Sequence, residues 1–265
     1  MIRLATYNIH YGREEKILLA SIVEMATQGV DIFCFQEVRK SGNNPFIGDK
    51  ILAVLGPNWQ AEYFLQPKNI TYTALGLCIM WETSVLELKS VEKLYLPLLQ
   101  KLSWWDYVFQ KFARANIELG TWLKMFSGAS KPEISQRGAL VCNFYFQGLP
   151  LGVCNAHLDY AGGMKHRLKQ IQYIWSRLKG KPQVSREIIC GDFNTIGPLW
   201  KAKKVATRIL QELDNKFLDT MSVISPTLVL FQRCDYVLQK GFTGAESKVL
   251  RIKGSDHKPL MAVLE

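Results

Sequence analysis

Polar residues that bind metal ions or transfer protons recur at the ends of apolar stretches in this chain of 265 residues. The last such segment is GSDHKPL, residues 254–260. The earlier ones are TYNIH at 6–10, FQEV at 35–38, NAHLD at 155–159 and GDFN at 191–194. Three of the four histidines, His10, His157 and His257, lie in these segments. Together the segments indicate one active site.

This set of residue types suits the hydrolysis of phosphate esters. The attacking oxygen must approach a centre shielded by negative oxygens, so catalysis needs cations, an activated water and help for the leaving oxygen. Glu37 ends an apolar run, where an unpaired buried carboxylate would be costly. Mg²⁺, which prefers a few carboxylates plus water, would give it a partner. A salt bridge from Glu37 to Arg3 or Arg39 is the alternative.

Asp192 and Asn194 share the end of a second apolar run, with Gly191 before them and Phe193 between them. In an extended segment, side chains two positions apart face the same way. Both polar groups would therefore point to one side. The alternative for this pair is an ordinary Asx turn.

His257 follows Asp256 near the end of the chain. A histidine that takes a proton from water must be held in one tautomer and orientation by a neighbouring acceptor. Asp235, in the segment RCDYVL, is a candidate for that acceptor, although a strand-start cap is the alternative for it. A loop histidine is the alternative for His257, and a structural histidine for His157.

Length and composition limit the number of domains and the class of fold. A chain of this length that is 48% apolar can bury a large core as a single α/β domain. Its cysteines stand singly, with no CxxC pair, and no secretory leader precedes the first strand-like segment. We expect buried, reduced thiols and a cytoplasmic protein.

The net charge of +10 favours a polyanionic partner, because Lys and Arg attract phosphate at long range. Nucleic acid and anionic membrane both fit. A basic surface without such a partner is the alternative, since the excess charge is spread along the chain. No apolar run reaches the roughly 20 residues that a membrane-spanning helix needs.

Short apolar runs alternate with helix-like segments through most of the chain. Apolar spacing predicts helices over 14–28, 165–178 and 199–213. Residues 2–9 alternate as a strand does, and almost wholly apolar runs are typical of strands covered on both faces. Those runs lie at 30–35, 74–81, 139–146, 151–155, 187–190, 234–238 and 260–264. Hairpin-sized gaps such as 147–150 favour mixed sheets flanked by helices.

One segment does not follow this alternation of strand-like and helix-like stretches. From Lys93 to Lys131, aromatic and basic residues intermingle without strand character. The apolar residues recur at steps near three and four, or sums of them: Leu102, Trp105, Phe109, Phe112, Leu119, Trp122 and Phe126. This spacing predicts an amphipathic helical insertion at about 93–131. Because the chain has no repeat or linker, we predict a single domain over 1–265.

The segments TYNIH, FQEV, NAHLD, GDFN, CDYVL and SDHKPL together resemble the endonuclease/exonuclease/phosphatase superfamily of DNase I-like metal-dependent phosphohydrolases. They span essentially the whole chain, in the family's order. The resemblance implies an α/β fold of four layers, in which two packed mixed β-sheets are flanked by helices. It also implies an active site at one edge, where the strand ends converge.

The resemblance implies a metal site and a general base. Glu37 would be the main Mg²⁺ ligand, with Asn8 and Asp256 as nearby or second-site ligands, and Mn²⁺ is an alternative ion. His257 would be the general base, oriented by Asp235.

The remaining roles also follow from the resemblance. Asp192 would position the nucleophilic water or protonate the leaving oxygen, Asn194 would hold a phosphate oxygen, and His157 would stabilise developing charge. Arg137 resembles a phosphate-contacting arginine of DNase I-like members. His10 is a departure, because some nucleases of the family carry an acidic residue there, and it affects any second metal position that relies on that carboxylate.

The expected activity is Mg²⁺-dependent hydrolysis of phosphodiester bonds, with nucleic acid as the favoured substrate. Basic residues that follow His157 and Asn194 favour a nuclease: Lys165, Arg167, Lys169, Lys201, Lys203, Lys204 and Arg208. The alternative is a sphingomyelinase-like lipid phosphodiesterase, or a phosphoinositide or sugar phosphatase, whose insertion contacts an anionic membrane or phospholipid. We favour an insertion that packs as a lid, and a monomer. The intact residue set argues against a non-catalytic binding module.

Overall fold

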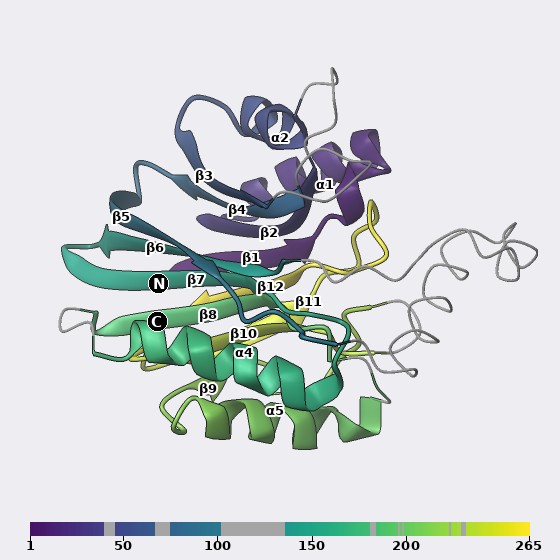
Figure 1. The fold of residues 1–265 in the computed structure, drawn as a ribbon. Helices are drawn as coiled ribbons and strands as arrows, with labels where there is room; N and C mark the ends of the chain where they lie inside the picture. The colour runs from purple at the N-terminus through teal and green to yellow at the C-terminus, as the bar shows by residue number, and fades with distance from the viewer. Residues whose placement is uncertain are drawn as a thin grey trace, which may run out of the picture.

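The computed structural model describes residues 1–39, 46–66, 75–101, 136–180, 184–195, 197, 199–222, 224–228 and 232–265. Two six-stranded β-sheets pack against each other, and helices cover their outer faces (Figure 1). Each sheet contains one parallel strand pair among antiparallel ones, so both are mixed. The predicted four-layer sandwich is confirmed.

The first sheet has the order β11-β12-β1-β2-β4-β3. Its strands are β1 (Ile2–Asn8), β2 (Ile32–Arg39), β3 (Trp59–Gln66), β4 (Leu75–Glu82), β11 (Ala245–Val249) and β12 (Leu260–Leu264). Two helices, α1 (Glu15–Thr27) and α2 (Ile47–Leu55), lie on its outer face (Figure 1). The 3₁₀ helix η1 (His10–Gly12) follows β1 directly.

The second sheet has the order β5-β6-β7-β8-β10-β9. Its strands are β5 (Leu86–Tyr95), β6 (Gly138–Phe146), β7 (Leu149–His157), β8 (Arg186–Asp192), β9 (Leu218–Asp219) and β10 (Asp235–Lys240). Its outer face is covered by α4 (Gly163–Leu178) and α5 (Ala202–Glu212), and the 3₁₀ helix η3 (Leu199–Lys201) precedes α5.

Apolar side chains fill all three spaces between the four layers. The cluster between the sheets joins residues such as Ile79 of β4 to Val153 of β7. Two further clusters lie under α1 with α2 and under α4 with α5. The central strands are therefore buried on both faces, which explains their nearly continuous apolar runs. All six cysteines are buried, as predicted.

A buried hydrogen-bond network, the polar tie between Gln36 and Asn155, crosses the otherwise apolar space between the sheets. Gln36 donates from Nε2 to Oδ1 of Asn155 at 2.7 Å and to Oγ1 of Thr6 at 2.9 Å. Asn155 in turn donates from Nδ2 to the carbonyl oxygens of Phe35 and Cys78, each at 2.9 Å. Buried polar groups are costly unless they are hydrogen-bonded, so this network favours one register of the two sheets. It lies one layer of residues below the strand ends.

The helical insertion predicted from residue 93 begins too early. Residues 93–95 are the end of β5, where they pair with β6, and 96–101 form no regular helix. Leu96 donates its N–H to the carbonyl of Arg137 at 2.9 Å, and Gln136 Nε2 donates to the carbonyl of Leu96 at 2.8 Å. The two ends of this segment therefore meet. The rest of the predicted insertion, residues 102–131, lies outside the described residues.

The ends of the central strands meet at one edge of the sandwich. In the second sheet, Asp192 pairs with His157 on one side and with Asp235 on the other. In the first sheet, Asn8 at the end of β1 pairs with Gln36, the residue before Glu37. Asn8, His157, Asp192 and Asp235 therefore stand at strand termini, which places their side chains at a common edge. Glu37 lies within β2, near its end.

Gly191 allows β7 and β8 to approach closely beside the edge. Its φ is +130°, and an added Cβ would lie 1.9 Å from the carbonyl oxygen of Ala156. No side chain fits in that space. The backbone conformation and the contact both require glycine immediately before Asp192.

We expect Gly191→Ala to lower the free energy of unfolding by about 3 kcal/mol, because the methyl group would push β8 away from β7. Urea unfolding measures this change. Gly148→Ala is the matched control, since Gly148 also has a positive φ of +76° but an added Cβ would meet nothing within 4 Å. It should cost only about 1 kcal/mol. Equal losses in the two variants would contradict the steric explanation.

Candidate active site

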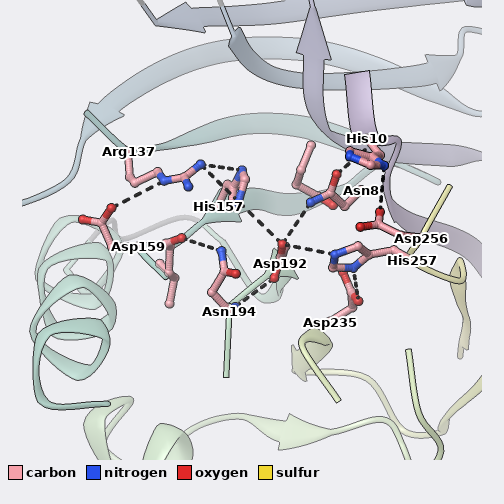
Figure 2. A network of polar contacts seen from close by, with 12 residues as sticks. Asn8, His10, Arg137, His157, Asp159, Asp192, Asn194, Asp235, Asp256 and His257 are labelled. Carbon is pink, nitrogen blue, oxygen red and sulfur yellow. Dashed lines mark hydrogen bonds and ion pairs between the residues drawn. The ribbon is translucent and has the colours of Figure 1, made fainter. Parts of the chain in front are cut away.

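The carboxylate of Asp192 is the centre of the polar network at this edge (Figure 2). Its Oδ2 accepts a hydrogen bond from Nδ2 of Asn8 at 3.0 Å, and its Oδ1 accepts one from the backbone N–H of Asn194 at 2.8 Å. The same Oδ2 lies 3.5 Å from Nε2 of His157 and 3.8 Å from Nε2 of His257. Both sheets therefore contribute to one carboxylate, which is 1% exposed.

Burial raises the pKa of Asp192 to about 6. The charge of His257 and the hydrogen bonds from Asn194 and Asn8 oppose this shift, while the charge of Asp235 adds to it. A carboxyl group of this kind can gain or lose a proton near neutral pH. Asp192 is therefore suited to exchange a proton with a bound molecule.

His257 is held by Asp235, as the sequence predicted. Nδ1 of the imidazole lies 2.9 Å from Oδ2 of Asp235, whose side chain is fully buried. The backbone N–H of Asp235 donates to Oγ1 of Thr227 at 3.1 Å, which fixes the start of β10. The pair leaves Nε2 of His257 directed toward Asp192 (Figure 2).

The charge of His257 depends on its carboxylate neighbours. Burial alone lowers the pKa of His257, but the charges of Asp235 and Asp192 and the hydrogen bond to Asp235 outweigh it and raise the pKa to about 10. The ring is thus an imidazolium in this arrangement. A general base must be neutral before it accepts a proton, so that role requires a change in the charge around the cluster.

His157 has the opposite character. Burial and the positive charges of Arg137 and His257 hold the pKa of His157 well below its ordinary value, so the ring is neutral. Nη1 of Arg137 lies 3.2 Å from each ring nitrogen of His157. The positive charge on this side of Asp192 therefore comes from Arg137. Asn194 completes this side by donating from Nδ2 to the carbonyl of Leu158 at 2.9 Å.

Two of the predicted metal ligands, Asn8 and Asp256, lie on the other side of Asp192 (Figure 2). Asp256 contacts His10, with 3.3 Å between Oδ1 and Nδ1, and Ser255 Oγ donates to the carbonyl of Asn8 at 2.7 Å. Among the described residues, one group of three acidic and histidine side chains is close enough to share an ion: Asp192, Asp235 and His257, within 4.8 Å of one another. Glu37 and Asp256 lie outside that cluster.

Glu37 occupies a β-bulge in β2. The pairing with β4 shifts between Gln36 and Val38, and Glu37 has a φ of +58°. The charge of Glu37 is the main cause of a raised pKa at Tyr11, so its carboxylate faces the η1 segment. Within the described part of the chain, Glu37 makes no ion pair with Arg3 or Arg39, which was the alternative expected from the sequence.

Left-handed backbone is concentrated at this edge. Seven described residues other than glycine have a positive φ, and four of them are at the site: His10, Tyr11, Glu37 and Asn194. Each such residue costs of order 1–3 kcal/mol and persists only where the surrounding structure enforces it. Strain that three separate segments share is typical of a functional site.

The sequence interpretation missed part of the site and misplaced one residue. Asp159 and His166 are buried behind Arg137, and the motif NAHLD with the one remaining histidine was the only available signal. Arg167 is also buried and donates to the carbonyls of Asp159 and Tyr160, so the prediction that it belongs to a phosphate-binding surface is wrong. The other predicted basic residues, Lys165, Lys169, Lys201, Lys203, Lys204 and Arg208, are exposed.

The same fold occurs in solved structures that cover this chain completely. An endonuclease/exonuclease/phosphatase family protein from Leptotrichia buccalis has a TM-score of 0.71 and 16% identity, with 100% of both chains covered. D. rerio TDP2 complexed with single strand DNA product has a TM-score of 0.64 and 15% identity, covering 100% of this chain and 98% of that one. The Bacteroides thetaiotaomicron mannosyl-6-phosphatase has a TM-score of 0.66 and 14% identity, with both chains covered completely.

No family model matches the sequence, and no curated protein matches it. The fold is that of a DNase I-like α/β sandwich. The chain has the fold of the endonuclease/exonuclease/phosphatase superfamily, so the resemblance stated from the sequence motifs is confirmed at the level of the fold.

We expect Asp235→Asn to lower the pKa of His257 from about 10 toward the ordinary value for histidine, because the substitution removes a negative charge that favours the imidazolium. Titration of the histidine ring signals by nuclear magnetic resonance measures this, with His257→Gln to assign the signal. The exposed Asp49→Asn should leave it unchanged. An unaltered His257 pKa in Asp235→Asn would show that Asp235 does not set its charge.

Proposed function

We propose that this protein is a metal-dependent phosphoesterase that hydrolyses phosphodiester bonds. The observation that carries the proposal is the buried carboxylate of Asp192, which receives a hydrogen bond from Asn8 and lies between His157 and His257. Arg137 brings a positive charge to the same edge. The site thus combines proton-exchanging groups with a cationic group that suits a phosphate oxygen.

The proposed roles divide between the two sides of Asp192. His257, oriented by Asp235, acts as general base once its ring is neutral. Asp192 positions the nucleophilic water or protonates the leaving oxygen, and its raised pKa supports the second task.

The phosphate side is formed by His157, Arg137 and Asn194. His157 stabilises developing charge by donating a hydrogen bond from its neutral ring, and Arg137 contacts a phosphate oxygen. One N–H of the Asn194 amide already bonds to Leu158, so the second N–H would hold the phosphate.

The predicted metal ligands carry the donor atoms that a divalent cation prefers. Glu37 and Asp256 supply carboxylate oxygens and Asn8 an amide oxygen, which are the hard donors that Mg²⁺ and Mn²⁺ prefer. The effect of Glu37 on the pKa of Tyr11 indicates negative charge at the bulge that the described residues leave without an ion-pair partner. We propose that Glu37, Asn8 and Asp256 hold Mg²⁺. When bound, the ion would supply positive charge that stabilises the phosphate as it becomes more negative.

Nucleic acid is the substrate that we favour. The net charge of +10 and the exposed Lys201, Lys203, Lys204 and Arg208 support it, since these residues follow Asn194 along η3 and α5. Trp200 is 78% exposed, with Nζ of Lys201 4.7 Å from its ring centroid, and such a ring beside a cation can stack on an unpaired base. D. rerio TDP2, which has this fold, is complexed with a single strand DNA product, and this supports a nucleic-acid substrate.

The lipid alternative depended on the predicted insertion, and residues 102–131 of it lie outside the described residues. No described helix is both long and apolar enough to cross a bilayer. The mannosyl-6-phosphatase with this fold keeps a sugar phosphate among the alternatives. These substrates are therefore compared directly with nucleic acid in the first experiment.

We expect purified protein with Mg²⁺ to hydrolyse nucleic acid, and His257→Ala to lower the rate by at least about 100-fold. The panel offers plasmid DNA, abasic duplex, single-stranded DNA, RNA, vesicles of sphingomyelin or phosphoinositide, and a sugar phosphate. Circular dichroism checks that the variant is folded. Turnover of vesicles or of the sugar phosphate alone would favour the alternatives, and full activity in His257→Ala would reject His257 as the base.

Replacement of Glu37 by Ala should weaken Mg²⁺ binding by at least about tenfold, because it removes the carboxylate at the bulge. Isothermal titration calorimetry of the free protein with Mg²⁺ or Mn²⁺ measures this without substrate. Glu24→Ala, on the exposed face of α1, is the control and should bind the ion as the wild type does. Equal affinity in the Glu37 and Glu24 variants would remove Glu37 from the metal site.

A further inference from the structure

A second buried polar network adjoins the site, and the proposed chemistry does not use it. Asp159 follows the end of β7, and His166 and Gln170 project from the first turns of α4. All three side chains are more than nine-tenths buried. Asp159 lies on the side of Arg137 away from Asp192 (Figure 2).

Asp159 is fixed by α4 at both its side chain and its backbone. Its Oδ2 accepts hydrogen bonds from Nε2 of His166 and from Nε2 of Gln170, each at 3.0 Å. Its backbone N–H donates to Oε1 of Gln170 at 2.9 Å. One carboxylate oxygen is therefore bound to the helix, while the other, Oδ1, lies 3.5 Å from Nε of Arg137.

The guanidinium of Arg137 is confined on three sides. Asp159 faces its Nε, the ring of His157 contacts its Nη1, and its Cζ lies 5.7 Å from the ring centroid of Tyr160. When a ligand fixes an arginine side chain that was free to rotate, the lost side-chain entropy costs up to about 2 kcal/mol of binding free energy. An arginine that is already confined loses less side-chain entropy on binding, so it binds an anion more tightly.

The contact between Asp159 and Arg137 is an ion pair without a hydrogen bond. Nε of Arg137 is a buried donor that has no hydrogen-bond partner among the described residues, although the side chain is mostly buried. Asp159 thus attracts the guanidinium without satisfying that donor. This differs from an ordinary structural pair such as Lys240 with Glu187, in which Nζ and Oε2 are 2.6 Å apart.

We propose that Asp159, held by His166 and Gln170, is a positioning residue that keeps Arg137 beside His157 for contact with a substrate phosphate. This inference rests on the proposed function of Arg137. Asp159 touches no reacting atom. Its effect on a phosphate ligand is therefore transmitted entirely through the guanidinium.

The test is a double-mutant cycle of Asp159→Asn and Arg137→Ala. Asparagine keeps the shape of the side chain, and its amide oxygen can still accept from His166 and Gln170, but it loses the charge that attracts Arg137. With bis(p-nitrophenyl) phosphate as the probe, Asp159→Asn should raise KM roughly tenfold with a smaller change in kcat. In the Arg137→Ala background, Asp159→Asn should have no further effect on KM.

Glu187→Gln is the matched control, because Glu187 is also a buried carboxylate in an ion pair but lies at the opposite end of β8 from Asp192. It should lower stability in urea without changing KM. His166→Ala, which removes one of the two hydrogen bonds to Asp159, should raise KM in the same direction as Asp159→Asn. A wild-type KM in folded Asp159→Asn, or additive effects in the double variant, would overturn the proposal.

Calorimetric titration with inorganic phosphate separates this inference from the proposed function. Asp159→Asn should weaken phosphate binding about tenfold only where Arg137 is present. If the wild type hydrolyses no phosphate ester while this coupling is retained, the proposed function fails and the positioning role stands. If turnover is found but the coupling is absent, the positioning role fails and the proposed function stands.

Discussion

The structure depends on the solvation of one buried carboxylate. Burying Asp192 without partners would be strongly unfavourable, and the protein offsets that penalty with donors from both sheets. Asn8 of β1 and His257, in the connection between β11 and β12, reach it from the first sheet. His157 and Asn194 reach it from the second sheet. The two sheets must therefore pack in one relative position. The same arrangement that solvates Asp192 also brings the proposed catalytic groups together.

The packed strands fix the backbone around this carboxylate, and the strained connections direct polar side chains toward the same edge. The buried tie between Gln36 and Asn155 fixes the sheets one layer below the site, and Gly191 lets two strands approach where any side chain would collide. Above that layer, the left-handed residues Glu37 and Asn194 turn polar groups toward the edge. A well-packed scaffold can hold such backbone strain, whereas a mobile loop would relax it.

The apolar runs predicted mixed sheets flanked by helices, because buried strands carry an unambiguous apolar signal, and the motif resemblance implied the four layers. The motifs also contained most of the polar residues that meet at the edge. The sequence interpretation missed β3, β5, β9 and β11, since very short strands and strands with an exposed face lack a continuous apolar run. The exposed faces carry charged residues such as Glu62, Glu87 and Lys89. The contacts of Asp159 with α4 and of His10 with Asp256 join residues through the fold, so spacing alone does not reveal them. The charge of His257 depends on distances to two carboxylates, which motifs do not contain.

The hydrogen bonds between Leu96 and residues 136 and 137 have a consequence for how such a protein changes over evolution. Because the two ends of the intervening segment meet, its length and content can vary at little entropic cost to the sheets. Any segment exchanged at this position would begin after Leu96 and end before Arg137, whose backbones are hydrogen-bonded to each other. A new substrate preference could thus be acquired by grafting at one point, while the polar network around Asp192 is inherited unchanged.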